Sequence, residues 1–256
     1  MTGFVVDIGN ARIKWAEVVG GELRARGDAL HVESPARAFD ALDSALPERL
    51  ERLLVANVAG PQLGVRLAAL ARQRFGLAPE FVKTTPELLG VRCGYEDPSR
   101  LGVDRWISLV AAHRLVAGAV CVVSAGTAVT FDAVDAGGQH LGGLILAGPR
   151  LAADALAEAT HDIGRTAPPG PPPDELGVLG RSTDAAVGHG AMLAIAAALD
   201  RAHRTVARAL GAPPPLLIAG GDGAAIVPWL ETKAELRADL VLEGLALFAE
   251  RREQAS

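Results

Sequence analysis

The sequence predicts an α/β fold made of two related lobes. Short apolar runs with the character of strands alternate with helical patterns along the 256 residues, which is typical of α/β architecture. A strand, a turn of small residues and a returning strand begin the sequence, and the same pattern starts again at residue 119. Such an internal repeat indicates two lobes with related cores, which we expect to span residues 1–115 and 116–256.

The first lobe is predicted to open with a strand, a tight turn and a second strand. The first apolar run ends at Asp7, and Gly9 and Asn10 supply the turn. Pro61 suits the first turn of a helix. The elements expected in this lobe are strands at 4–6, 13–16, 53–56 and 80–82 and helices at 35–50, 61–74 and from 103, the last with Ile107, Val110, Ala111 and Leu115 on one apolar face.

The second lobe repeats the opening pattern. Its first strand ends at Ser124, and Gly126 and Thr127 follow in the turn. Pro168–Pro173 is proline-rich and is expected to be an extended loop. The remaining elements expected here are strands at 119–123, 129–131, 144–146 and 216–219 and helices from Ser182 to about Leu210 and over 241–252.

Composition excludes several functional classes. With 30 acidic and 25 basic residues the net charge is −5, so the chain lacks the positive field that attracts nucleic acid, and we expect no nucleic-acid partner. No apolar run approaches a membrane span, and the N-terminus lacks signal-peptide features, so we expect a cytoplasmic protein without membrane contact. Cys93 and Cys121 are too few for a disulfide framework and are expected to be small buried hydrophobes.

Three familiar phosphate or nucleophile motifs are absent. None of the lysines, Lys14, Lys83 and Lys233, follows a glycine, which excludes a Walker A loop. The glycines at 221 and 223 are followed by Ile226 where a dinucleotide fingerprint needs a small residue. Ser124 lacks the leading glycine of a nucleophile elbow.

The two repeated turns are the remaining candidates for phosphate binding. Backbone N–H groups at Gly9 could face a phosphate, and Lys14 on the returning strand could reach the same anion. Asp7 has the wrong charge to contact phosphate directly, so it makes chemical sense through Mg²⁺ and its waters. Ser124 to Thr127 offer a second backbone cradle. The alternative is two ordinary hairpins with glycine turns.

These segments resemble the motifs of one kinase family. Asp7-Ile8-Gly9-Asn10-Ala11-Arg12-Ile13-Lys14 resembles the first phosphate motif of type III pantothenate kinases. Gly102-Val103-Asp104-Arg105 is similar to their Gly-x-Asp-Arg motif, and residues 125–132 with 141–145 resemble their second phosphate block. The resemblance implies the duplicated, two-lobed ribonuclease H-like fold of the actin and sugar-kinase superfamily, with ATP in the interlobe cleft.

The resemblance also implies an activity, which is ATP-dependent phosphorylation of pantothenate to 4′-phosphopantothenate, the first step of coenzyme A biosynthesis. It implies Asp104 as the catalytic base and Asp7 as a ligand of Mg²⁺ through water. The substrate-binding residues would be Tyr95, Gly102, Val103, Asp104, Arg105 and Thr183. The ATP- and phosphate-binding residues would be Asp7, Ile8, Gly9, Asn10, Ala11, Arg12, Ile13, Lys14, Gly126, Thr127, Gly220 and Gly221. A homodimer is implied as well, with Thr183 supplied to the substrate site across the interface.

Each residue also has a purely structural interpretation. A first-turn aspartate such as Asp104 complements the helix dipole, a role that is compatible with catalysis. Arg105 alone would be a solvated arginine, and Tyr95 alone fits core packing or a pocket wall. Thr183 alone would be a helix N-cap.

One position departs from the family pattern. Many members carry aspartate where this chain has Ser124, and that aspartate is their ligand for a monovalent cation, K⁺ or NH₄⁺. A hydroxyl is a poorer ligand for K⁺ than a carboxylate, so we predict weak or absent activation by K⁺.

Two other functions compete with this prediction. One is a non-catalytic relative with a regulatory role as a transcriptional accessory protein. The other is a kinase or phosphatase of a different small metabolite, because a fold does not determine a function.

Overall fold

The computed structural model describes residues 3–164, 166, 169–172 and 175–253. Pro168 and Pro173 of the predicted proline loop lie outside these described residues. The chain divides into two compact units: unit 1 comprises Met1–Leu89, Tyr95–Ala111 and Asp239–Ser256, and unit 2 comprises Gly90–Gly94 and Ala112–Ala238. The chain therefore passes between the units four times. The expected division at residue 115 differs from these units, because the last helix belongs to unit 1.

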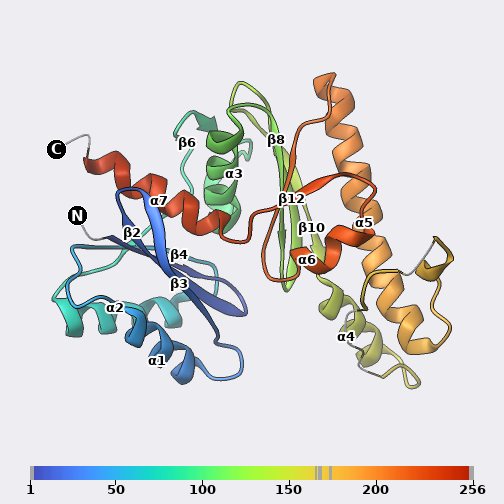
Figure 1. The fold of residues 1–256 in the computed structure, drawn as a ribbon, viewed down its shortest axis with the longest axis horizontal. Coiled ribbons are helices and arrows are strands. Elements are labelled where there is room, and N and C mark those ends of the chain that lie inside the picture. Colours follow the sequence, from blue (N-terminus) through green and yellow to red (C-terminus); the bar gives the residue numbers. More distant parts are fainter. Residues whose placement is uncertain (1–2, 165, 167–168, 173–174, 254–256) are drawn as a thin grey trace. The chain divides into compact units, whose positions relative to one another are not determined.

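Unit 1 is built on a five-stranded mixed sheet with the order β3-β2-β1-β4-β5. β1 is antiparallel to β2 and parallel to β4. Its strands are β1 (Gly3–Ile8), β2 (Arg12–Val19), β3 (Glu22–Leu30), β4 (Arg52–Asn57) and β5 (Glu80–Phe81). Phe4, Val6 and Ile8 alternate along β1 and enter one core with residues of α1 (Pro35–Ala45) and α2 (Pro61–Phe75). Figure 1 shows α1 and α2 on one face of this sheet and α7 (Leu240–Glu253) on the other.

Helix α1 is shorter than the sequence pattern suggests. A helix over 35–50 was expected, but α1 ends at Ala45 and Leu46 is extended, with φ −66° and ψ 137°. Pro47 explains the difference, because the ring of a proline disfavours helical backbone in the residue before it.

Unit 2 repeats the topology of unit 1. Its five strands have the order β10-β9-β8-β11-β12, with β8 antiparallel to β9 and parallel to β11. They are β8 (Val120–Ala125), β9 (Ala128–Val134), β10 (His140–Ala147), β11 (Leu216–Ala219) and β12 (Ala234–Leu236). The long helix α5 (Thr183–Leu210) contributes Met192, Ile195 and Leu199 to the core of this sheet. The repeated strand order confirms the predicted duplication.

The other elements connect or flank the two sheets. In unit 2, α4 (Pro149–Ala159) packs against α5. α3 (Val103–Val116) carries the chain from unit 1 into unit 2. The short elements are β6 (Glu87–Leu88), β7 (Val91–Arg92), η1 (Pro98–Arg100), η2 (Glu175–Val178), α6 (Gly223–Ile226) and η3 (Val227–Trp229). None of the described helices is long and apolar enough to cross a membrane.

Two local predictions need correction. Leu115 was expected on the apolar face of α3, but 48% of it is exposed, whereas Ile107, Val110 and Ala111 are buried as predicted. The N-cap of α5 is Ser182, whose hydroxyl accepts the Ala185 N–H at 3.2 Å, so Thr183 is the first helical residue instead of the cap.

Candidate active site

The first phosphate turn of unit 1 places a carboxylate beside an amine. The β1–β2 register pairs Asp7 directly with Lys14, and paired residues of antiparallel strands project from the same face. Val6 and Ile8 enter the core with α1 and α2, so Asp7, which lies between them on the strand, points to the opposite face. Asp7 and Lys14 therefore share the face of the sheet that α7 contacts.

Asp7 is electrostatically unusual. Its Oδ1 atom is shielded from solvent and has no hydrogen-bond partner among the described residues. The pKa of Asp7 is raised to about 7, mainly by burial and also by the nearby Asp104 carboxylate, while Lys14 partly opposes both effects. Although they lie far apart in sequence, Asp7 and Asp104 are thus close enough to interact.

This carboxylate suits a hydrated divalent cation. An anion without hydrogen-bond donors is stabilised by a nearby positive charge, and Mg²⁺ binds through one or two carboxylates while keeping several waters. The described residues contain no group of three or more metal-ligating side chains, so a complete protein cage is absent from them. Asp7 therefore fits Mg²⁺ held through water and substrate oxygens.

The turn is stabilised by hydrogen bonds from a histidine. The Gly9 N–H donates to the Arg12 carbonyl at 3.0 Å, which closes the turn. His31 Nε2 lies 2.7 Å from the Gly9 carbonyl, so this nitrogen carries the proton, and the His31 N–H donates to the Ala11 carbonyl at 3.0 Å. No sequence signal pointed to His31, because it follows a different strand.

The residues of the first motif are not equally available to a ligand. Asn10 is exposed at the tip of the turn. Arg12 forms an ion pair with Asp28, and the side chains of Ile8 and Ile13 are fully buried in the core. Ile8 and Ile13 therefore offer a ligand only their backbone.

Asp104 lies at the start of α3, as the sequence predicts. The Gly102 carbonyl accepts the Trp106 N–H at 3.0 Å, and Asp104 Oδ1 accepts the N–H of Arg105 at 2.8 Å. A Cβ added to Gly102 would lie 2.7 Å from Asp104 Oδ1. Glycine at 102 thus gives the carboxylate of Asp104 room to fold back over the helix start, beside the half-buried Val103.

Arg105 and Tyr95 form a pair. Arg105 is only 6% exposed, so its interpretation as a solvated surface arginine is wrong. Its Nη1 donates to the Tyr95 hydroxyl at 3.1 Å, and its guanidinium carbon lies 5.8 Å from the centre of the tyrosine ring. The two polar groups of the predicted substrate motif are therefore held together within unit 1.

The second phosphate turn, in unit 2, is assembled from two strand ends. β8 and β11 are parallel, and their register aligns Ser124 with Ala219. Gly220 has φ +92°, and a Cβ at this position would lie 2.1 Å from the Ala125 carbonyl oxygen. The chain after β11 thus passes close over the end of β8, which brings Gly220 and Gly221 near the turn at Gly126 and Thr127.

A fourth glycine, Gly148, packs against this turn. The Gly148 N–H donates to the Thr127 carbonyl at 3.0 Å, and a Cβ on Gly148 would lie 2.2 Å from the Gly126 carbonyl oxygen. The Thr127 side chain remains exposed, whereas Ser124 is half-buried at the strand end. Gly148 was not predicted from the sequence to support the turn, although it directly precedes a helix that starts with proline.

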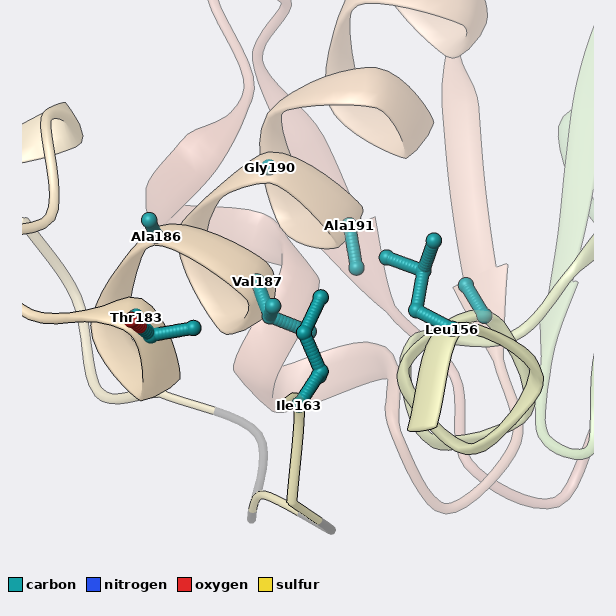
Figure 2. A pocket seen from close by; sticks show the side chains of 8 residues that line it. Leu156, Ile163, Thr183, Ala186, Val187, Gly190 and Ala191 are labelled. Atoms are coloured by element: carbon teal, nitrogen blue, oxygen red, sulfur yellow. The ribbon is translucent and has the colours of Figure 1, made fainter. Parts of the chain in front are cut away.

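Thr183 lies elsewhere in unit 2, at the edge of an apolar hollow. The hollow measures 540 Å³ and lies between α4 and the first turns of α5. Figure 2 shows Leu156 and Ile163 facing the α5 residues Thr183, Val187 and Ala191 across it. Among the described residues that line the hollow, Thr183 supplies the only hydroxyl, and the others are aliphatic or glycine.

Comparison with known proteins gives a consistent family assignment. Residues 3–205 match the family model described as type III pantothenate kinase. The chain is 36% identical over 252 residues to a type III pantothenate kinase of Nitrosococcus oceani, covering 96% of this chain and 92% of that protein. It is 38% identical to one of Xanthomonas campestris pv. campestris, covering 97% and 98%.

Solved structures agree on the fold. The (R)-2-hydroxyglutaryl-CoA dehydratase component A of Acidaminococcus fermentans matches with a TM-score of 0.58 at 12% identity, covering 99% of both chains. A conserved protein of Campylobacter jejuni, described as a candidate Baf-family transcriptional activator, matches with a TM-score of 0.59 at 17% identity, covering 98% and 99%. At these identities the likeness concerns the fold alone, and it agrees with the predicted duplicated α/β fold of the actin and sugar-kinase superfamily.

Proposed function

This chain belongs to the type III pantothenate kinase family, and on that premise we propose how its residues transfer the γ-phosphoryl group of ATP to the hydroxyl group of pantothenate. The family is one of ATP-dependent kinases, and its members' sequence likeness extends over nearly the whole chain. The observation that carries the proposed residue roles is the convergence of Asp7, Lys14 and Asp104 on one side of unit 1.

Lys14 and the first turn act on the phosphates. The Lys14 ammonium attracts the negative oxygens, and the half-buried Gly9 and the exposed Asn10 lie in the turn that joins the strands of Asp7 and Lys14. Asp7 would hold Mg²⁺ through water, and the bound ion would neutralise part of the phosphate charge. In unit 2, Gly126 and Thr127 with Gly220 and Gly221 form a second turn that binds phosphate.

Asp104 acts on the acceptor hydroxyl. Its carboxylate accepts the hydroxyl proton as the oxygen attacks phosphorus, while its hydrogen bond from the Arg105 N–H fixes the side chain. Phosphoryl transfer proceeds through a loose transition state, so alignment and charge stabilisation contribute more than early deprotonation. Arg105 and Tyr95, already joined by a hydrogen bond, orient pantothenate together with Gly102 and Val103.

We further propose a homodimer in which Thr183 reaches the partner's substrate. Exposed apolar side chains on β10 and α4 support this proposal: Leu144, Ile145, Leu151 and Leu156 are between 43% and 64% exposed. A cytoplasmic location and the relaxed need for K⁺ at Ser124 also remain proposals.

The first test is pantothenate-dependent formation of ADP from Mg-ATP by the purified protein. We expect Asp104→Asn to lower kcat by roughly 10²- to 10⁴-fold, because asparagine keeps the oxygen that accepts the Arg105 N–H but cannot take a proton. The thermal midpoint should stay close to that of the unsubstituted protein. Asp40→Asn, at an exposed position on α1, is the matched control and should retain full activity.

Near-normal kcat in the Asp104→Asn variant would remove the assignment of Asp104 as the base. Absence of pantothenate-dependent ADP formation, with K⁺ and NH₄⁺ supplied, would instead favour a regulatory relative or a different acceptor. A thermal-shift screen with pantothenate and other small alcohols then separates these two alternatives.

A further inference from the structure

The side chain of Asp239 lies between two cations of unit 1. Its Oδ1 is 3.8 Å from the Nζ atom of Lys14, and its Oδ2 is 2.8 Å from Nη1 of Arg26. Lys14 and Asp239 are mostly shielded, at 20% and 23% side-chain exposure, whereas Arg26 is 51% exposed. Each carboxylate oxygen therefore faces a different cation, and the closer contact is with the arginine.

The backbone holds Asp239 firmly in this place. Asp239 directly precedes α7, and its carbonyl accepts the Glu243 N–H at 2.9 Å, the first turn of the helix. α7 in turn contacts β1, β2, β3 and β4 and packs closely on α3, where Gly244 lies against Ile107. The position of the carboxylate is thus set by a packed helix, and Lys14 comes from the strand pair that also carries Asp7.

We propose that Asp239 is a positioning residue that aims the Lys14 ammonium, and that Arg26 controls how strongly it does so. This inference rests on the proposed function, in which Lys14 binds the phosphates of ATP. Without Asp239, the flexible lysine side chain would lose the anion that faces it from the start of α7, and its direction toward the phosphates would be less well fixed.

Arg26 prevents the carboxylate of Asp239 from weakening the binding of ATP. An uncompensated carboxylate near a triphosphate repels it and competes with it for the lysine. Because Arg26 binds Oδ2 at 2.8 Å, much of the charge of Asp239 is already neutralised and Lys14 is held by the longer, weaker contact. The lysine is therefore positioned but still able to turn to a phosphate.

Steady-state kinetics with varied ATP and saturating pantothenate test this arrangement. We expect Asp239→Asn to lower kcat about 3- to 5-fold, which is the upper range for a single ion pair without a hydrogen bond, and Asp239→Glu to recover part of that loss. We expect Arg26→Gln to raise KM for ATP roughly 3- to 5-fold with little change in kcat, since Asp239 then holds Lys14 more tightly. In the Asp239→Asn background, Arg26→Gln should no longer change KM.

Two matched controls each remove a charge of the same sign at a neighbouring position. Arg24→Gln lies on the same strand as Arg26, and Glu243→Gln lies in the first turn of the same helix as Asp239. Both should leave kcat and KM for ATP within twofold of the unsubstituted values. Thermal midpoints of all variants show whether a kinetic loss merely reflects poorer folding, and if Asp239→Asn does not fold, Arg26→Gln and Asp239→Glu carry the test.

The outcomes separate this inference from the proposed function. If Lys14→Met leaves kcat and KM for ATP unchanged, the role of Lys14 itself is wrong. If Lys14→Met impairs the enzyme but Asp239→Asn behaves like Glu243→Gln, the positioning role of Asp239 is overturned. Additive effects of Arg26→Gln and Asp239→Asn on KM would overturn the part assigned to Arg26.

Discussion

At the scale of single residues, the buried carboxylate of Asp7 lowers the free energy of unfolding at neutral pH. Its buried carboxylate has a pKa raised to about 7, so the folded protein keeps this proton over a pH range in which the unfolded chain, with a pKa of 3.8, has lost it. The free energy of unfolding therefore falls as pH rises from about 4 to 7, and the full penalty persists above that range. The proposed role of Asp7 in holding a cation therefore comes with a lower stability of the fold above pH 4.

Asp7→Asn should accordingly stabilise the protein at pH 8 and lose this advantage near pH 4. The gain is at most about 4 kcal/mol, from roughly 1.4 kcal/mol per pKa unit. Urea unfolding of both proteins at the two pH values measures it, with Asp40→Asn as the exposed control. An equal difference in stability at pH 4 and pH 8 would contradict a raised pKa at Asp7.

Ser124 allows a prediction about cation dependence. Because a hydroxyl binds K⁺ less well than a carboxylate, ADP formation should change little when K⁺ replaces Na⁺ at constant ionic strength. Ser124→Asp should introduce activation by K⁺ at this half-buried strand end, and Ser124→Ala should not. A steep K⁺ dependence of the unsubstituted protein would refute the prediction.

At the scale of elements, the second phosphate turn depends on Gly220. This residue has φ +92°, and any Cβ would meet the carbonyl of Ala125 at 2.1 Å, so a side chain here must displace either β8 or the turn after β11. Its neighbour Asp222 donates its N–H to the same carbonyl, which ties the two strand ends together.

Gly220→Ala should raise KM for ATP and lower stability more than Gly211→Ala does. Gly211 ends α5 with φ +79° and has open space around its Cβ position, so its substitution isolates the cost of left-handed backbone, about 1 kcal/mol. The additional loss of stability in Gly220→Ala then gives the energetic cost of the steric clash with the Ala125 carbonyl. Chemical unfolding and ATP kinetics of the two variants provide the comparison, and equal losses would mean that the approach is easily relieved.

The sequence predicted elements and local pairs well, because these depend on nearby residues. The apolar runs and the turn at Gly9 predicted β1 and β2, and their pairing brought Asp7 beside Lys14. The start of α3 at Asp104 followed from the same local reasoning. The early end of α1 was missed although Pro47 was visible, since the apolar spacing continued past it.

Contacts between distant segments could not be predicted in the same way. Nothing near Lys14 in the sequence points to Asp239, because their proximity depends on how α7 packs on the sheet of unit 1. His31 and Gly148 stabilise the two turns by donating hydrogen bonds to backbone carbonyl groups. Every residue has such a carbonyl, so the sequence does not show which ones will be bonded.

At the scale of the whole molecule, the exposed apolar residues of unit 2 bear on the proposed homodimer. Ile145 on β10 is 64% exposed, and a cluster of such residues on one unit is typical of an interaction surface. We expect Ile145→Glu to convert a homodimer into monomers and to reduce turnover, because Thr183 would no longer reach the partner's substrate. Val65→Glu, at a 69% exposed position on α2 of unit 1, is the control and should remain dimeric.

Light scattering coupled to size-exclusion chromatography gives the mass of each variant directly. A dimeric Ile145→Glu variant would move the interface away from β10. A monomeric unsubstituted protein with full activity would refute the proposed homodimer and the role of Thr183 across it.

The route of the chain has a consequence for biosynthesis. Unit 1 opens with β1 but is finished by α7, whereas the segments of unit 2 lie between Gly90 and Ala238. During synthesis, one face of the sheet of unit 1 therefore lacks its helix until α7 leaves the ribosome. By that time all strands of unit 2 have already been synthesised. A nascent chain stalled before residue 239 would lack both the helix that contacts β1 and the carboxylate that faces Lys14. The N-terminal half of this protein is thus the first to be synthesised and the last to mature.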